Sequence, residues 1–191
     1  RGACKAAQTQ QEAGNTFHFF SECNDKGSNK SNISYLYSRE WKTMGEVRAK
    51  KALGQHFLVD LNIARKICDS LSGGDAAGGP STVLEVGCGM GVLTQFLLRR
   101  DDIVTYGAEI DSESVEYLHE HYPEFAPRLI EGDFLRMNLR ERFPDGLRII
   151  GNFPYNISSQ IFFKVLENRD LVPECVGMIQ REVAVRLAEP P

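Results

Sequence analysis

From residue 82 onward, short apolar segments alternate with helical segments, and this alternation constrains the fold more than any other feature. Each apolar segment is a nearly continuous run, which is typical of a strand buried on both faces of a sheet. Strands that alternate with helices pair in parallel, and the helices cover the sheet. We therefore predict an α/β fold with a doubly wound, mostly parallel sheet of at least five strands, at residues 82–86, 103–109, 128–133, 147–153 and 175–180.

Helices are expected before and between these strands. Asp60 can cap a first helix, because apolar residues after it recur at helical spacing. A glycine turn after the first strand leads into a helix that ends near Arg99. Further helices are predicted at 112–122 and 158–166.

The first 43 residues differ from the rest of the chain. They are rich in Gln, Asn, Ser, Lys and Gly without a sustained helical or strand period, so we expect a disordered or loosely attached extension. The chain begins with Arg, and Met44 makes sense as a start, so residues 1–43 are expected to be non-native or upstream sequence. Residues 44–191 then form one domain. We expect it to be incomplete, because a sheet ending at the fifth strand would leave a bare edge.

Composition narrows the class of protein. The 191 residues are 42% hydrophobic, which is enough for one core. No run reaches the ~18–20 apolar residues of a membrane span, and no N-terminal stretch has the layout of a signal peptide. The five cysteines include no Cys-x-x-Cys pair, which argues against a disulfide framework or a zinc site. We expect a cytoplasmic protein without a metal or a membrane partner.

The charge balance leaves nucleic-acid binding open. A net charge of −4 and a pI near 5.6 argue mildly against it, although basic footprints are local. Solvated charge on ordinary surface is the better explanation of either of two basic clusters taken alone. They are Lys42, Arg48, Lys50 and Lys51, and Arg136, Arg140, Arg142 and Arg148.

The first candidate site is the turn from Glu85 to Gly91, EVGCGMG, which follows a strand and opens a helix. Its glycines allow a tight turn and a close approach to a ligand. Such a turn suits NAD, FAD or S-adenosylmethionine, but the third glycine comes two residues after the second, not three as in dinucleotide sites. Glu85 suits a ligand with a cationic amino-acid head better than a pyrophosphate. A plain strand–helix turn is the alternative.

Acidic residues end the next two strands. Glu109 lies 18 residues after Gly91, and a carboxylate about 20 residues on can accept hydrogen bonds from both ribose hydroxyls. Asp111 has a strong alternative as the N-cap of the next helix. Asp133 could accept a hydrogen bond from the amino group of an adenine, and it is equally typical of a turn.

The most informative segment is the tetrad Asn152-Phe153-Pro154-Tyr155, which closes the fourth strand. In a doubly wound sheet the ends of the first and fourth strands flank the ligand crevice, so the tetrad should face the glycine turn. The Asn152 side-chain carbonyl and the Pro154 backbone carbonyl can accept the two N–H bonds of an aromatic amine, which localises its lone pair. Tyr155 can stack on the base, a contact worth ~1–3 kcal/mol. An Asn-x-Pro turn with a packed Tyr is the alternative.

On these motifs the chain resembles the ribosomal RNA adenine dimethyltransferases, the family of the small-subunit dimethylases and the Erm resistance methylases. The likeness runs from about Ala49 to Leu187 and opens with KALGQHFL at 51–58. It implies a Rossmann-like class I methyltransferase fold and S-adenosylmethionine as cofactor. Phe153 departs from the family pattern, in which Leu or Ile is commoner. The implied cofactor-binding residues are Gln55, His56, Leu58, Glu85, Gly87, Gly89, Gly91, Glu109, Asp133 and Asn152, and the implied catalytic residues are Asn152, Pro154 and Tyr155.

The resemblance also implies a reaction and a partner. The enzyme would dimethylate N6 of two adjacent adenines near the 3′ end of small-subunit ribosomal RNA, as a monomer acting on a pre-30S particle in ribosome biogenesis. The family continues with two more strands and a small helical domain, which we expect to be missing here. Three rivals remain: an Erm-type methylase of large-subunit RNA, a nicotinamide dehydrogenase, and a catalytically silent RNA-binding assembly factor.

Overall fold

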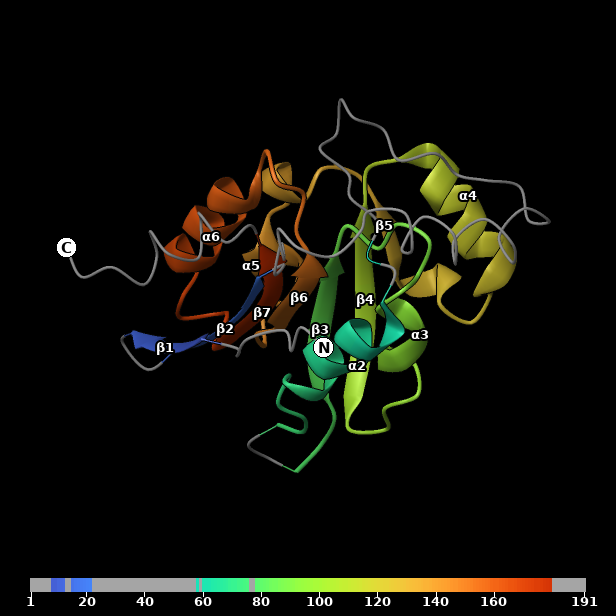
Figure 1. Cartoon of the computed structure of the whole chain (residues 1–191). Coiled ribbons are helices and arrows are strands. Elements are labelled where there is room, and N and C mark those ends of the chain that lie inside the picture. The colour runs from blue at the N-terminus through green and yellow to red at the C-terminus, as the bar shows by residue number, and fades with distance from the viewer. Residues whose placement is uncertain (1–7, 13–14, 22–57, 59, 76–77, 180–191) are drawn as a thin grey trace, which may run out of the picture.

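The computed structural model describes residues 8–12, 15–21, 58, 60–75 and 78–179. These residues form one seven-stranded sheet with helices on both of its faces (Figure 1). Every neighbouring pair of strands is parallel except the pair at one edge, where the first strand runs antiparallel to the second. The predicted doubly wound, mostly parallel sheet is therefore confirmed.

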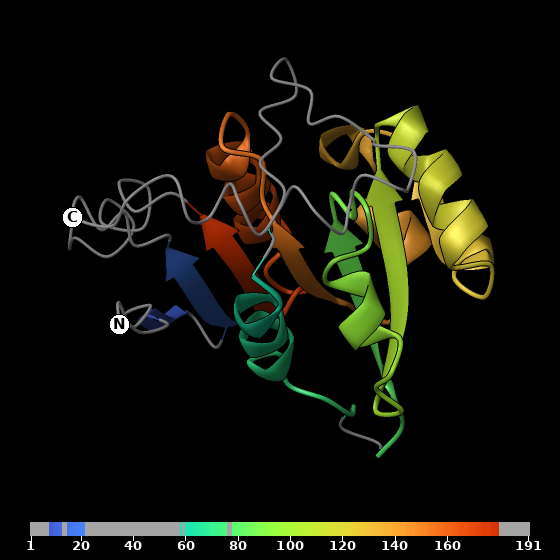
Figure 2. The ribbon, with the colours of Figure 1, turned by 45° about the vertical axis from the view of Figure 1, so that its right-hand side comes forward.

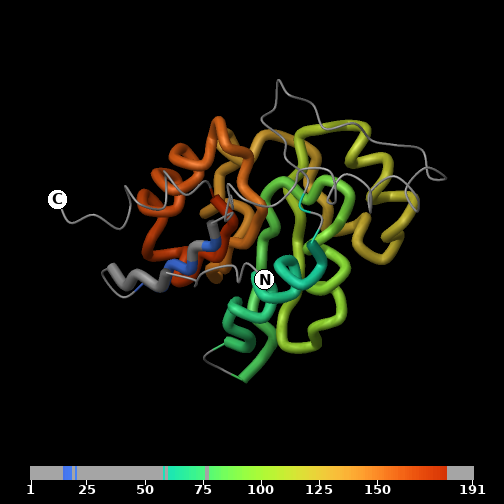
Figure 3. Tube along the Cα trace, viewed as in Figure 1, coloured from blue at the N-terminus to red at the C-terminus, as the bar shows by residue number. Residues whose placement is uncertain are grey.

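The order of the strands places a crevice in the middle of the sheet. The strands are β1 Gln8–Glu12, β2 Asn15–Ser21, β3 Ser81–Val86, β4 Ile103–Glu109, β5 Leu129–Glu131, β6 Arg148–Asn152 and β7 Glu174–Ile179. They lie in the order β1-β2-β7-β6-β3-β4-β5. The chain adds β4 and β5 on one side of β3 and then returns to place β6 and β7 on the other (Figure 3). Ligands bind at such reversals, beyond the carboxyl ends of the strands.

The helices are α2 Leu61–Asp69, α3 Thr94–Leu97, α4 Ser112–His121, α5 Leu139–Arg142 and α6 Ser158–Glu167, with 3-10 turns η2 Ala126–Arg128 and η3 Phe134–Arg136. Both expected caps are present. Asp60 accepts the Asn62 N–H at 2.8 Å, and Asp111 accepts the backbone N–H and the hydroxyl of Ser114 at 3.2 and 2.9 Å. None of the helices in these ranges is long and apolar enough to cross a membrane.

Two layers of helices bury the central strands. Adjacent side chains along a strand point to opposite faces, so Leu84 of β3 joins the core that contains Ile161 and Val165 of α6, whereas Val83 joins the core that contains Ile67 of α2. All five side chains are fully buried. Figure 2 shows α2 and α6 on opposite sides of the sheet. This double coverage explains why the strands read as continuous apolar runs.

The N-terminal segment corrects one prediction. We expected residues 1–43 to lack regular structure, but β2 pairs in parallel with β7 over six residues, and β1 completes a hairpin. The Asn15 side-chain amide donates to the Arg169 and Val172 carbonyls at 2.6 and 2.7 Å, and Phe17 is buried in the core. The Asn15–Arg169 contact spans 154 residues, so no local periodicity could report it. The edge of β7, expected to be bare, is covered by β2.

Two predicted elements are also shorter in the structure than expected. The third strand covers Leu129–Glu131 and not 128–133, because Gly132 adopts a φ of 148° and Asp133 already caps η3. The helix expected to end near Arg99 is limited to Thr94–Leu97. The first change lies beside the crevice, because Gly132 and Asp133 line the pocket, whereas the helix ends shortly before β4 begins, at the other end of the strands.

Candidate functional site

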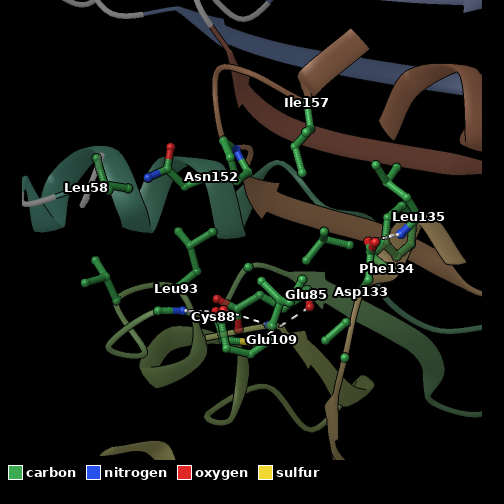
Figure 4. A pocket seen from close by; sticks show the side chains of 18 of the residues that line it. Leu58, Glu85, Cys88, Leu93, Glu109, Asp133, Phe134, Leu135, Asn152 and Ile157 are labelled. Carbon is green, nitrogen blue, oxygen red and sulfur yellow. Dashed lines mark hydrogen bonds between the residues drawn. The ribbon is translucent and has the colours of Figure 1, made fainter. Parts of the chain in front are cut away.

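A pocket opens at the carboxyl ends of the central strands (Figure 4). The glycine turn after β3, the end of β4, the segment after β5 and the segment after β6 all contribute to its walls. Figure 4 shows Asn152 and Ile157 across the pocket from Glu85 and Glu109. The two motifs that we expected to meet therefore line one cavity. Its lining residues include Leu58, Glu85, Gly87, Cys88, Gly89, Glu109, Asp133, Phe134, Asn152, Pro154, Asn156 and Ile157.

The glycine turn depends on glycine at three positions. Gly87, Gly89 and Gly91 have φ angles of 74°, 53° and 77°, in the left-handed region that other residues rarely adopt. A Cβ atom at Gly91 would also lie 2.6 Å from the Tyr122 ring, and one at Gly87 would reach 3.9 Å from Pro154 Cδ. The turn thus packs against Tyr122, the residue that follows α4, on one side and approaches the tetrad on the other.

Glu109 holds the turn in place from the end of β4. Its carboxylate accepts backbone N–H bonds from Gly89 at 2.8 Å and from Ile110 and Asp111 at 2.9 Å. The side chain is 3% exposed, and burial raises its pKa, while the three backbone donors oppose that shift. Three of the roughly four acceptor positions of a carboxylate are thereby used. Glu109 is a clamp for the turn as well as a pocket wall.

Glu85 lies beneath the same turn and is 1% exposed. The Thr94 hydroxyl donates to its carboxylate at 2.6 Å. Burial raises the pKa of Glu85 to about 8; the Thr94 hydrogen bond opposes the shift and the nearby charge of Glu109 adds to it. A cation arriving in the pocket would favour the ionised form. The pocket therefore holds two buried carboxyl groups, and neither has a cationic partner within the part of the chain that the structure describes.

Asp133 combines the two roles that its sequence context left open. Its carboxylate accepts the Leu135 N–H at 2.8 Å and so caps η3, and it also lines the pocket. Lys164 of α6 donates to the carbonyls of Leu135 and Met137 at 2.9 and 2.7 Å. The segment that carries Asp133 is thus tied to the helix that follows the tetrad, a contact that no sequence signal indicated.

The tetrad presents its polar groups to the pocket and buries its aromatic centre. Asn152 and Pro154 line the cavity, whereas Phe153 is 1% exposed and points into the core. The Pro154 carbonyl already accepts the Ile157 N–H at 3.2 Å, which leaves it one lone pair for a second donor. Tyr155 is half-buried and is not among the lining residues.

The remaining expected residues divide into three groups. Leu58 is buried and lines the pocket, as expected. Gly91 shapes the turn without lining the cavity. Gln55 and His56 lie outside the described residues. Sequence reasoning missed Asn156 and Ile157, which line the pocket, and Thr94 and Tyr122, which support the turn.

The second basic cluster does not act as one unit. Arg140 pairs with Asp170 at 2.6 Å on the surface, and Arg148 pairs with the buried Glu174 at 3.0 Å at the opposite end of β6. Arg136 is 90% exposed and forms an ion pair at 3.5 Å with Asp133, which lines the pocket. The cluster at 42–51 lies outside the described residues. In the described part of the chain, no group of His, Cys, Asp and Glu could hold a metal ion.

Comparison with known proteins relates the chain to a family by sequence and to a solved structure by fold. Residues 46–191 match the sequence profile of the family described as Ribosomal RNA adenine dimethylase. The chain belongs to this family. Its curated relatives include the Ribosomal RNA small subunit methyltransferase A of Porphyromonas gingivalis, 59% identical over 78% of this chain and 56% of the relative. The protein of the same name from Parabacteroides distasonis is 53% identical over 76% of this chain and 53% of the relative.

A solved structure of the 23S rRNA methyltransferase ErmE also resembles the chain. Its TM-score is 0.56 at 27% identity, over 68% of this chain and 50% of that one. The chain spans about half the length of the curated relatives it matches. The family match covers β3 to β7 and the whole pocket but leaves β1 and β2 outside it.

Proposed function

We propose that the chain binds S-adenosylmethionine in this pocket and transfers methyl groups to N6 of two adjacent adenines near the 3′ end of small-subunit ribosomal RNA. The observation that carries the proposal is that the glycine turn and the tetrad line the same cavity. One wall suits a cationic methyl donor and the other suits an aromatic amine. Membership of the adenine dimethylase family supports the same chemistry.

The cofactor wall fits S-adenosylmethionine in charge and shape. When bound, this cofactor supplies an electrophilic methyl group on a positively charged sulfur. The buried carboxyl groups of Glu85 and Glu109 offer the compensating negative charge. Glu109 keeps one acceptor position for a ribose hydroxyl, and Asp133, Leu58 and the glycine turn enclose the rest. We assign Gln55 and His56 to this wall on the family pattern alone.

On the target wall, acceptors orient the amine. The Asn152 side-chain carbonyl and the free lone pair of the Pro154 carbonyl accept the two N6 hydrogens, which draws the nitrogen toward tetrahedral geometry. The lone pair then points at the methyl carbon, a C–N bond forms as the C–S bond breaks, and the amine later loses a proton to solvent. Positioning carries the rate. Tyr155 stacks on the adenine, which must first leave its own stack.

The small-subunit substrate is favoured over the large-subunit one. Relatives named for the small subunit are 53–59% identical, whereas the 23S rRNA methyltransferase structure is 27% identical. We infer a pre-30S particle as the partner and the cytoplasm as the site of action, with the protein acting as a monomer. The decisive assay incubates the protein with labelled S-adenosylmethionine and purified under-methylated subunits. Label is expected in small-subunit RNA, and label confined to large subunits would select the Erm-type alternative.

Cofactor choice is tested separately by calorimetric titration. S-adenosylmethionine is expected to bind and NAD to fail as a competitor. Binding of NAD in its place would refute the methyltransferase assignment. RNA binding without any methyl transfer, under conditions where the cofactor binds, would favour the assembly-factor alternative.

A further inference from the structure

Phe153, in the middle of the tetrad, faces away from the pocket. Its ring is 1% exposed and meets Phe162 of α6 edge-on, with centroids 5.7 Å apart. Its backbone N–H donates to the Met178 carbonyl at 3.2 Å, which extends the β6–β7 ladder by one bond past Asn152. The tetrad is therefore anchored at its centre, between the two residues that present acceptors to the pocket.

The ring lies over a pair of glycines. Gly151 of β6 and Gly177 of β7 are direct partners in the sheet. A Cβ atom at Gly177 would lie 2.2, 2.7 and 3.0 Å from three Phe153 ring carbons, and one at Gly151 would lie 2.7 Å from the ring. Neither glycine has a left-handed φ. At both positions glycine provides space and not backbone freedom: space for the ring at Gly177, and space for the ring and for the Val86 carbonyl oxygen at Gly151.

We propose that Phe153 is a positioning residue: its ring, seated on the Gly151–Gly177 pair, fixes where Asn152 and Pro154 stand relative to the methyl donor. The inference rests on the proposed function. Because the ring contacts Gly177 of β7, a substitution on that strand is expected to move the acceptor groups of Asn152 and Pro154, at the end of β6 and just after it. A shift of about 1 Å in positioned groups can cost on the order of 100-fold in rate. The packing of the Phe153 ring on the two glycines is therefore expected to affect the rate of methyl transfer far more than the affinity for the cofactor.

The two glycines provide a test and a matched control. All three closest atoms to a Cβ at Gly177 belong to the Phe153 ring, so Gly177→Ala should push the ring away and Phe153→Leu should relieve the clash. A Cβ at Gly151 would also lie 2.6 Å from the Val86 carbonyl oxygen. That clash is with backbone, and Phe153→Leu cannot relieve it.

We expect a loss of methyl-transfer rate without a loss of cofactor affinity, and recovery of the rate only in the Gly177 variant when Phe153 is also replaced. Gly177→Ala should lower kcat by about 10–100-fold and leave the Kd for S-adenosylmethionine within about twofold. The double variant Gly177→Ala with Phe153→Leu should return to within about threefold of Phe153→Leu alone, as directly coupled residues do. Phe153→Leu should not rescue Gly151→Ala.

Hydrogen exchange supplies a readout that needs no turnover. The amides of Phe153 and Ile157 should exchange faster in Gly177→Ala and recover in the double variant. Unchanged kcat and exchange in Gly177→Ala, or a double variant no better than the single one, would overturn the inference. A wild-type protein without methyl transfer would instead refute the proposed function, and exchange would still decide the role of the ring. If Gly177→Ala does not fold, Phe153→Ala replaces it, and unchanged exchange at Ile157 would overturn the inference.

Discussion

The two walls of the pocket are built by different means. On the cofactor wall, buried carboxyl groups and hydrogen bonds of 2.6–2.9 Å hold the glycine turn, through Glu85, Thr94 and Glu109. On the target wall, one aromatic ring packed over two glycines holds the tetrad, and Asn152 and Pro154 are left half-buried at the cavity. One wall is fixed mainly by electrostatics and the other mainly by sterics.

Because of this difference, we expect substitutions to affect cofactor affinity and the rate of methyl transfer separately. Changes on the cofactor wall should weaken cofactor binding and destabilise the fold, because the same side chains hold the glycine turn and form the proposed cofactor site. Changes on the target wall should leave the cofactor bound and reduce the rate.

Asn152→Ala should abolish most methyl transfer. It removes an acceptor aimed at the target amine, and removal of a single preorganised hydrogen-bonding group typically costs about 10²–10³ in kcat. The Kd for S-adenosylmethionine should stay within about threefold of wild type, since the substitution leaves Glu85, Glu109 and the glycine turn of the proposed cofactor wall unchanged. Rates come from labelled methyl incorporation into under-methylated small subunits, and Kd from calorimetry.

The matched control for this change is Asn138→Ala. Asn138 is an exposed asparagine that caps α5 and does not line the pocket. It should transfer methyl groups at close to the wild-type rate. Transfer by Asn152→Ala at the same rate as this control would remove the target wall from the mechanism.

Glu109→Ala should lower stability and the affinity for S-adenosylmethionine, in contrast to Asn152→Ala, which should mainly lower the rate of methyl transfer. It leaves three backbone N–H groups without their acceptor, and each buried orphan donor costs about 1–3 kcal/mol. We expect a fall in melting temperature, and a loss of about 10–100-fold in affinity for S-adenosylmethionine, which corresponds to the cost of about one such donor. Glu131→Ala is the control, because Glu131 is the exposed neighbour of Glu109 in β5. Equal Tm and Kd in both variants would contradict the clamp.

The sequence predicted the sheet and the motifs of the pocket for a physical reason. Strands buried on both faces are apolar throughout, and residues at the carboxyl ends of parallel strands must converge, so Glu85, Glu109 and Asn152 could be placed in one site. Contacts between residues far apart in the sequence produce no such pattern of apolar residues or motifs. The pairing of β2 with β7 and the support of Gly91 by Tyr122 depend on partners that periodicity does not reveal.

Cofactor affinity should depend on pH through Glu85. Its pKa of about 8 lies above the ordinary value of 4.5, so at pH 7 only about a tenth of the groups are ionised. A bound cation favours the ionised form, so affinity for S-adenosylmethionine should rise by up to about tenfold between pH 7 and 9, with a proton released on binding. Calorimetry in buffers of different ionisation enthalpy measures both.

The same group makes the free chain less stable at higher pH. A raised folded pKa contributes stability that is fully present below about 4.5 and is lost as pH rises through about 8. Glu85→Gln keeps a partner for Thr94 and removes the titration. Relative to this variant, wild type should lose melting temperature between pH 5 and 8. Parallel pH profiles of Kd and Tm for the two proteins would show that Glu85 does not titrate in this range.

Tyr122→Phe should have the smallest effect. The ring fills the space beside Gly91, where a Cβ atom would come within 2.6 Å of it, whereas the hydroxyl reaches the Gly91 carbonyl only at 3.4 Å. So long a hydrogen bond is weak. Losing it should change the Kd for S-adenosylmethionine by no more than about twofold, whereas Tyr122→Ala, which removes the ring, should cost about tenfold. If the two variants were equally impaired, the hydroxyl would be what holds the third glycine. The cofactor wall would then depend on hydrogen bonds throughout, and its contrast with the packed target wall would be sharper than the ring contact suggests.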